Sequence, residues 1–525
     1  MNDTTKTGII SSKTPLEIPL RTICHFPIDG MITFSTRFLR MFNYGLITPV
    51  LFLYCKEIGL SEIQTGILIS LILAGDLVIT LYLSTRADTL IGRRRTLIIG
   101  AVLKIFAGLT FAFTTEYWLL VIAGTIGVIS SSGGECGPFQ AIEQACLTDA
   151  VIKATNEKEG NTGKGNTGSV AILFGYYAFV GYVAAALGAL TSGYSCYILQ
   201  QSLYRYTPLQ TYKLVFICYA IIGLIMAILY SLLSIHTEIK ISTIKSQTRK
   251  TTKNDSSPCQ SNLGYISRVG NYLGLIRPES IYIIARLSFF FALDSFAGAF
   301  VLQTWISFYF YERWNFEENY TGILLSISNI AAGVSGIMAS YCVQRFGAML
   351  TMIVSHLPSN WFLLAIPFAT NGFAACALLV TRFSISQMDV PARQAYVAMA
   401  VMADERSAAG GITNIVKSLG AALAPNILGY LSSAQPRTSF LFASPWIIAG
   451  VLKCVYDISL YTLYLSDPTM VNAGKNSGGS TLERSVGSTP HTIQNSQETT
   501  ADFDELKKSL LDTNDDTGIN GSPKT

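Results

Sequence analysis

Charged residues are scarce in this sequence. Only 13% of its 525 residues are Asp, Glu, Lys or Arg, whereas half are hydrophobic. A soluble globular chain carries about a quarter charged residues, so the deficit excludes an ordinary soluble domain and indicates a membrane protein. The formal net charge of +4 is small, and we expect no nucleic-acid partner.

Patterns of metal-binding and redox residues are missing as well. The ten cysteines occur singly and no CxxC is present, which is typical of small buried hydrophobic residues rather than disulfides or metal ligands. The four histidines stand alone, so the sequence has no zinc motif of the HExxH kind. We expect no metal and no cofactor.

Enzyme motifs are also absent. The glycine-rich segment GNTGKGNTG (160–168) lacks the spacing, and the Ser or Thr after Lys, that a nucleotide-binding P-loop requires. We find no paired carboxylates, histidine cluster or nucleophile elbow on a plausible membrane-facing surface. The sequence therefore predicts that the chain is not an enzyme.

What the sequence does contain is a series of long apolar runs between about residues 31 and 466. A helix that spans a bilayer needs roughly 20 mostly apolar residues. We predict an all-α integral membrane protein with about twelve such helices in two bundles of six. The predicted spans lie near 31–54, 62–84, 96–115, 117–140, 168–193, 212–235, 281–309, 319–342, 349–369, 373–396, 409–432 and 441–465.

Polar segments separate and flank the two sets of six spans. No charged region followed by a short apolar stretch opens the chain, so no cleaved signal peptide is indicated. The predicted organisation is a cytoplasmic N-terminal segment (1–30), a six-helix bundle (31–236), a cytoplasmic central loop (237–279), a second six-helix bundle (280–466) and a disordered cytoplasmic tail (467–525).

Lys and Arg are unevenly distributed among the connectors. They are concentrated after the second and fourth spans and in the central loop, and they are few in the alternate connectors. Because such residues stay on the cytoplasmic side of a membrane, both termini are predicted to be cytoplasmic. Whether the host is the plasma membrane or an internal membrane stays open.

The two halves of the sequence look like copies of one another. TGILISL (65–71) matches TGILLSI (321–327), and the segments around Pro138 and Pro391 can be aligned in the same order. A parallel repeat of this kind lets a transporter rock two bundles about a binding site at the bilayer midplane.

The connector after the second span reads ADTLIGRRRTL (87–97). Its acid, glycine and arginines resemble the signature of the major facilitator superfamily, as does the layout of six plus six helices. Three residues separate Asp88 from Gly92 where the signature has two, and the second-half copy around Gly347 lacks the arginines. Longer stretches such as SQMDVPARQAY (386–396) resemble a fungal and bacterial branch of the superfamily, for which the resemblance supplies no substrate.

The resemblance implies a cytoplasmic gate. In the family, the acid and arginines of the signature form charge pairs with neighbouring helix ends and hold the inner gate shut. The positive-inside rule by itself explains the sign of the arginines, and that alternative stays open. Asp389 and Arg393 are four residues apart, share a helix face and lie towards the inner end of the tenth span. The predicted gate residues are Asp88, Gly92, Arg93, Arg94, Glu135, Glu143, Asp389 and Arg393.

Two ionisable residues are expected at similar depth near the middle of the bilayer, Asp294 on the seventh span and Arg382 on the tenth. Charged groups at this depth are costly, so each is a candidate functional residue. In the family, spans 1, 4, 7 and 10 line the cavity. Polar lining is expected from Asn43, Ser131 and Gln303.

Two interpretations of Asp294 and Arg382 stay open. In the first, Asp294 gains and loses a proton as the carrier cycles, and Arg382 responds to its charge. In the second, the two residues form a static ion pair that holds the bundle together. Two further pairs are predicted to be structural, Arg40 with Asp76 and Lys453 with Asp457.

The predicted function is secondary active transport of a small polar or amphipathic solute by alternating access, with proton coupling as one form of it. An arginine at mid-depth favours anionic or zwitterionic solutes. The fifth span lacks the glycine–proline motif of antiporters, so that motif gives drug–proton antiport no support. The alternative is a transporter-like membrane sensor without net flux. Expected partners are the solute, the lipid bilayer and, in the coupled form, protons, and we expect a monomer.

Overall fold

The structure, a computed structural model, describes residues 28–86, 91–127, 129, 139–140, 142–144, 146–147, 166–201, 206–234, 278–400 and 406–466. Backbone packing groups Met1–Gly479 into one unit and Ser480–Thr525 into another, and every described residue belongs to the first. Most of the predicted N-terminal segment and central loop, the predicted tail, and the candidates Asp88, Ser131 and Glu135 lie outside the described residues. The predicted bundle boundaries stay a prediction.

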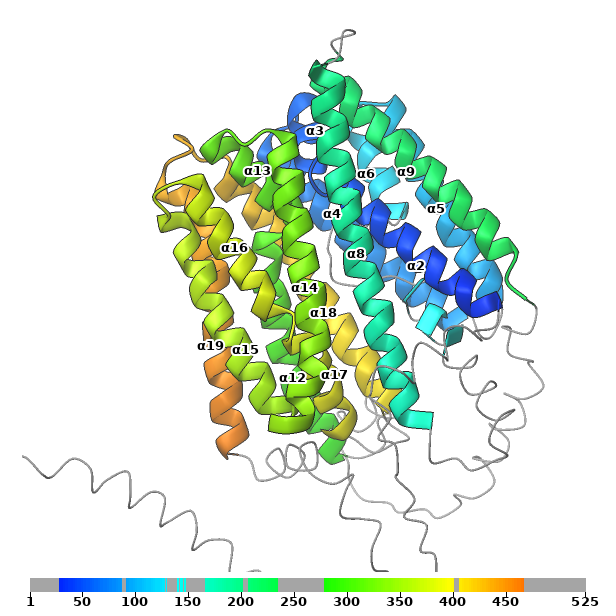
Figure 1. The fold of residues 1–525 in the computed structure, drawn as a ribbon, viewed down its shortest axis with the longest axis vertical. Helices are drawn as coiled ribbons and strands as arrows, with labels where there is room; N and C mark the ends of the chain where they lie inside the picture. The colour runs from blue at the N-terminus through cyan, green and yellow to red at the C-terminus, as the bar shows by residue number, and fades with distance from the viewer. Residues whose placement is uncertain are drawn as a thin grey trace, which may run out of the picture. The chain divides into compact units, whose positions relative to one another are not determined.

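All regular elements in the described part of the chain are helices (Figure 1). The described residues 28–234 are called the first half. Its helices are α2 (Ile28–Ile47), α3 (Leu51–Glu57), α4 (Glu62–Arg86), α5 (Arg93–Phe113), α6 (Tyr117–Ile126), α8 (Asn166–Gln201) and α9 (Pro208–Ser231).

The described residues 278–466 are called the second half. Its α-helices are α12 (Pro278–Gly298), α13 (Gln303–Trp314), α14 (Glu318–Phe346), α15 (Ala348–Ala365), α16 (Gly372–Ser386), α17 (Asp389–Ala400), α18 (Arg406–Ser432) and α19 (Phe440–Ser466). Two short 3-10 helices, η3 (Ala299–Val301) and η4 (Ile366–Phe368), follow α12 and α15.

Several predicted spans consist of two helices. Among the described helices, nine stretches are long and apolar enough to cross a membrane, and α2 with α3, bent by 40°, makes a tenth. Pro49 lies in the break between α2 and α3, where a proline disfavours a continuing helix. Pro391 follows Gln387 by four residues, and its ring would crowd the Gln387 carbonyl in an unbroken helix, which explains the turn between α16 and α17.

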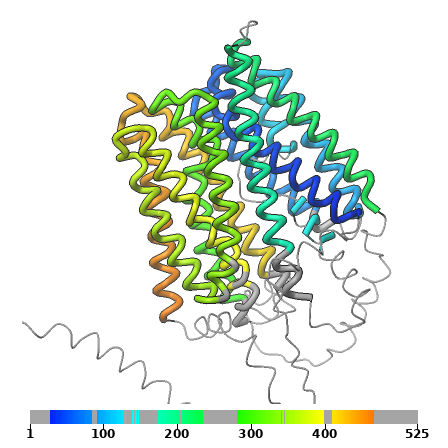
Figure 2. The backbone as a smooth tube through the Cα atoms, viewed as in Figure 1, coloured from blue at the N-terminus to red at the C-terminus, as the bar shows by residue number. Residues whose placement is uncertain are grey.

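The same helix contacts occur in both halves, as a sequence repeat requires. Helix α2 packs on α8 and α5 on α9, and in the second half α12 packs on α18 and α15 on α19. Two extensive contacts join the halves, α8 with α14 and α4 with α18. Figure 2 shows α8 and α14, far apart in sequence, running side by side.

Glycines let the helices of the two halves approach closely. A Cβ added to Gly193 of α8 would lie 2.4 Å from the Glu318 carbonyl oxygen and 3.0 Å from the Gly322 Cα. Gly66 of α4 and Gly429 of α18 make the equivalent contact in the other interface. Small residues at these positions bring the backbones together where apolar lipid supplies no hydrophobic driving force.

Candidate functional site: two buried charge clusters

Asp294 of α12 lies at the centre of a network of buried charges. Its carboxylate accepts a hydrogen bond from Arg393 Nη1 of α17 at 3.0 Å and another from the Lys453 ammonium of α19. Arg393 Nη2 also donates to Asp389 at 2.7 Å, across one helical turn. One arginine therefore connects two carboxylates, and a lysine from a third helix completes the pairing.

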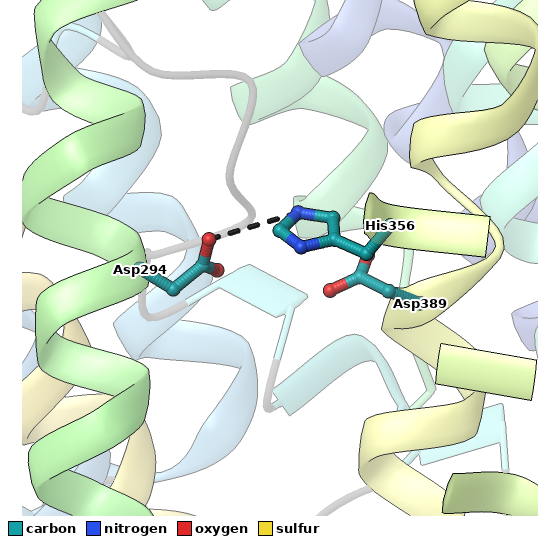
Figure 3. Close-up of side chains that lie close together, drawn as sticks. All are labelled: Asp294, His356 and Asp389. Carbon is teal, nitrogen blue, oxygen red and sulfur yellow. Dashed lines mark ion pairs between the residues drawn. The ribbon is translucent and has the colours of Figure 1, made fainter. Parts of the chain in front are cut away.

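His356 of α15 also belongs to the network, and its ring points towards Asp294 (Figure 3). Its Nε2 lies 3.7 Å from Asp294 Oδ1, and its Nδ1 lies 2.8 Å from Asp457 Oδ1. Asn360 Nδ2 donates to the second Asp457 oxygen at 2.8 Å. The imidazole thus lies between two buried carboxylates. The Asp294 cluster is defined as Asp294, His356, Asp389, Arg393, Lys453 and Asp457.

Three members of this cluster have the donor atoms of a metal site. Ligand atoms of Asp294, His356 and Asp389 lie within 4.8 Å of one another. The same two carboxylates are, however, bonded to Arg393 and Lys453. A divalent cation at this position would face two fixed positive charges, so the surroundings favour an ion-pair network over a metal centre.

The predicted pair of Asp294 with Arg382 is not the pair that forms. Both side chains are buried and described, and no ion pair joins them; the partners of Asp294 are Arg393 and Lys453. Arg382 and Arg393 are eleven residues apart, so a continuous helix would put them on nearly the same face about 16 Å apart. The spacing in the sequence therefore cannot decide which of the two arginines pairs with Asp294. Arg382 stays close enough to Asp294 and Asp389 to interact electrostatically.

Three members of the cluster were not predicted as functional residues. His356 stands alone in sequence and matches no motif, and the four-residue spacing of Lys453 and Asp457 predicts a pair within one helix. Instead Lys453 bonds Asp294, and Asp457 bonds His356 and Asn360. The available signal was their position inside apolar spans, where an ionisable residue is a functional candidate whatever its neighbours in sequence.

A second cluster lies within the first half. Arg40 of α2 donates to Glu143 Oε2 and to the Tyr177 hydroxyl, both at 2.9 Å. Glu143 also accepts hydrogen bonds from the Tyr230 hydroxyl at 2.6 Å, from the Tyr177 hydroxyl, and from Thr36 Oγ1 at 3.4 Å. These five residues are called the Glu143 cluster.

The Glu143 cluster corrects two predictions. Arg40 was expected to pair with Asp76, but its ion pair is with Glu143. Asp76 is buried and interacts with Arg40 and Lys104 only at longer range. Glu143 was expected as a gate partner of the signature arginines, and its carboxylate is instead surrounded by donors from the first half.

The two clusters are related by a reversal of sign. In the first half, Arg40 of the first span pairs with Glu143, three residues beyond the predicted end of the fourth span; in the second half, Asp294 of the seventh span pairs with Arg393 of the tenth. Each half therefore has a buried ion pair between its first span and a residue in or just beyond its fourth.

The remaining polar candidates bond partners in their own half. Asn43 donates to the Tyr219 carbonyl oxygen at 3.1 Å. Gln303 and Asn329 exchange hydrogen bonds of 3.1 and 3.3 Å. One polar contact crosses between the halves near the break in the tenth span, from the Tyr182 hydroxyl to Gln387 Oε1 at 2.8 Å.

The predicted gate signature is partly described. Gly92 has a φ of 92°, and Gly347, its copy before α15, has a φ of 83°. This conformation favours glycine, which explains why both copies keep that residue. Arg93 is buried, and Arg94 donates to the Ser231 carbonyl oxygen at the end of α9. A cation there also complements the negative end of the helix dipole.

Ion pairs also join the halves at the end of the molecule where α3 contacts α13, called the α3–α13 end. Lys56 bonds Glu312. Arg437, in the connector between α18 and α19, bonds Glu62 and lies 3.0 Å from Glu312. Four charges from four segments therefore connect the first half to the second at this end.

Comparison with known proteins agrees with this architecture. Residues 33–425 match the model of the Major Facilitator Superfamily. The chain is 27% identical over 444 residues to the uncharacterised membrane protein YJR124C of Saccharomyces cerevisiae, covering 83% of this chain and 94% of that protein. It is 22% identical to the quinolone resistance protein NorA of Staphylococcus aureus, covering 79% and 92%.

Solved transporter structures show the same fold. A variant of the nucleoside transporter NupG superimposes with a TM-score of 0.60 at 14% identity, covering 83% of this chain and all of that one. A D-xylose–proton symporter gives 0.57 at 14% identity, covering 84% and 97%. These matches confirm the predicted all-α membrane fold with about twelve helices in two six-helix bundles. The chain belongs to the Major Facilitator Superfamily.

Proposed function

We propose that this membrane transporter is a secondary active carrier of a small solute, and that the Asp294 cluster couples solute movement to protons. The observation that carries the proposal is the buried contact of His356 with both Asp294 and Asp457. Histidine is the side chain whose charge changes most readily near neutral pH. A titratable group enclosed by ion pairs of several spans can link proton binding to their rearrangement.

The charges around His356 support this assignment. Three carboxylates and three cations from four helices lie in or beside the cluster: Asp294 (α12), Asp389 (α17), Asp457 (α19), Arg382 (α16), Arg393 (α17) and Lys453 (α19). With a neutral imidazole these charges balance. A further proton leaves an excess positive charge, which is costly at bilayer depth. An anionic group of the solute would compensate it.

Arg382 is the residue we assign to the solute. Its side chain is buried, and its Nε has no hydrogen-bond partner among the described residues. A buried donor without a partner costs free energy that a ligand acceptor would recover. The proposed solute is therefore anionic or zwitterionic, with its acidic group at Arg382.

The α3–α13 end supports alternating access. With both termini proposed to be cytoplasmic, this end faces away from the cytoplasm, and the bonds of Lys56 and Arg437 keep its two halves together. Opening towards that side requires these ion pairs to break. The glycine–arginine turn at Gly92 is proposed as part of the cytoplasmic gate.

Flux through proteoliposomes tests the proposal against the alternative of a sensor. A thermal-stability screen of nucleosides, sugars, peptides, quinolones and organic acids first identifies a stabilising solute. We expect this solute to exchange across the membrane in a counterflow assay, and its uptake to rise with an imposed proton gradient. Stabilisation without counterflow would contradict a carrier and identify a sensor.

A further inference from the structure

A groove opens on the outer surface of the second half, away from the charge clusters. Its volume is about 490 Å³, and it is lined by Tyr282, Ala285, Arg286, Phe289, Phe290 and Leu463 from α12 and α19. Tyr282 and Phe289 are 55% and 66% exposed. Since this part of α12 belongs to a membrane span, the groove is open to lipid.

Arg286 is the one charged residue among the six that line the groove. Its guanidinium lies over the Tyr282 ring, 4.1 Å from the centroid. It follows Pro278, the first residue of α12, by eight residues, which is about 12 Å along a helix. Arg286 therefore lies near one membrane surface, within reach of lipid headgroups for a long side chain.

We propose that this groove binds an anionic glycerophospholipid, with the lipid phosphate on Arg286 and an acyl chain against Phe289, Phe290 and Leu463. The planar guanidinium presents donors that match two phosphate oxygens. The apolar rest of the groove fits a hydrocarbon chain and offers nothing to a free phosphate ion. The ligand thus has one charged end and one apolar end, as the groove does.

The lining also selects among phospholipids. None of the six lining residues is acidic, so Arg286 gives the groove a net positive charge. A headgroup with a net negative charge, such as that of phosphatidylserine, is therefore favoured over a zwitterionic headgroup with no net charge. The proposed topology puts this end of α12 in the cytoplasmic leaflet, where anionic lipids are concentrated.

A lipid in this groove would contact α12 and α19, two of the four helices that contribute to the Asp294 cluster. Asp294 follows Arg286 by eight residues on α12, and Lys453, which bonds Asp294, lies on α19. The lipid would therefore stabilise the packing of α12 on α19.

Native mass spectrometry of the full chain tests the proposal. The protein is purified in detergent and mixed with equal amounts of phosphatidylserine and phosphatidylcholine. We expect the wild type to retain phosphatidylserine preferentially, and Arg286→Gln to lose about fivefold of that preference. If Arg286→Gln impairs folding, Arg286→Met tests the same prediction, because an apolar side chain is tolerated at a lipid-facing position.

Arg345→Gln is the matched control. Arg345 is an exposed arginine beside an aromatic ring in the last turn of α14, and it does not line the groove. Its removal should leave the preference intact. The proposal is overturned if the wild type shows no preference for phosphatidylserine, if the Arg286 variants keep it, or if Arg345→Gln reduces it equally.

Discussion

Glu143 shows how a single carboxylate is held inside a membrane bundle. An arginine and three hydroxyl groups surround it, so that its charge is paired and its lone pairs are used. Burying a charge is tolerated only with such compensation, and removing one partner leaves an uncompensated charge. Asp294 is compensated differently, by two cations and an imidazole.

Arg40→Met should destabilise the protein because Glu143 loses its counter-ion. Breaking a buried pair in this way costs about 3–5 kcal/mol in soluble proteins. Thermal unfolding in detergent measures the loss. Adding Glu143→Gln, which keeps an acceptor for the tyrosine hydroxyls but no charge, should restore much of it. If the double variant is no more stable than Arg40→Met, the loss of stability does not come from the unpaired charge of Glu143.

Gly92→Ala should also lower thermal stability, because an alanine is strained at a φ of 92°. A strained backbone conformation of this kind costs about 1–3 kcal/mol. Gly336→Ala in α14 is the control, since a Cβ there meets nothing within 4 Å and the residue is helical. Equal effects from the two substitutions would contradict the conformational role of Gly92.

At the scale of helices, the spans follow from the apolar runs, and the breaks in the first and tenth spans follow from proline chemistry. The break between α16 and α17 in the tenth span can be expected from Pro391. The clash of the proline ring with the preceding turn depends only on local sequence. Which faces of two spans pack together depends on the tertiary arrangement and not on the local sequence. Hence the glycine contacts between α8 and α14 come only from the structure.

Gly193→Ala should weaken the packing of α8 on α14. The added Cβ would lie 2.4 Å from the Glu318 carbonyl oxygen, so the helices must separate, at a cost of about 1–3 kcal/mol. The expected results are a lower unfolding temperature and slower counterflow. Gly175→Ala, on the same helix with nothing within 4 Å of its added Cβ, should change neither. Identical behaviour of the two variants would rule out the close contact.

The charge clusters show the limit of sequence reasoning. Hydropathy identifies which ionisable residues lie in the membrane, and Asp294, Arg382, Arg40 and Asp76 were found in this way. Their partners depend on helix rotation and on the reach of long side chains. Asp294 therefore pairs with Arg393 rather than Arg382, and Arg40 pairs with Glu143 rather than Asp76. His356 carries no local motif at all.

At the scale of the whole molecule, the two halves are joined by ion pairs at the α3–α13 end and by helix packing along α8–α14 and α4–α18. Ion pairs in contact with water contribute little free energy and exchange easily. They suit a contact that must form and break in each transport cycle.

Arg437→Gln should shift the protein towards a state open at the α3–α13 end, because it removes the bonds to Glu62 and Glu312. Spin labels at Glu57 and Thr438, in a background with the native cysteines replaced, report the separation of the halves. We expect a larger population of long distances. Arg313→Gln removes a neighbouring arginine outside these ion pairs and should leave the distances unchanged. Unchanged distances in Arg437→Gln would refute the role of these ion pairs in holding the α3–α13 end closed.

The most direct test of the central claim is the dependence of solute uptake on a proton gradient in Asp294→Asn. In proteoliposomes, the wild type should accumulate the stabilising solute when a pH gradient is imposed, and Glu57→Gln, which removes an exposed carboxylate, should do the same. Asp294→Asn should keep solute exchange at equal concentrations but lose accumulation driven by the gradient. Accumulation in Asp294→Asn equal to that of the wild type would contradict proton coupling through the Asp294 cluster.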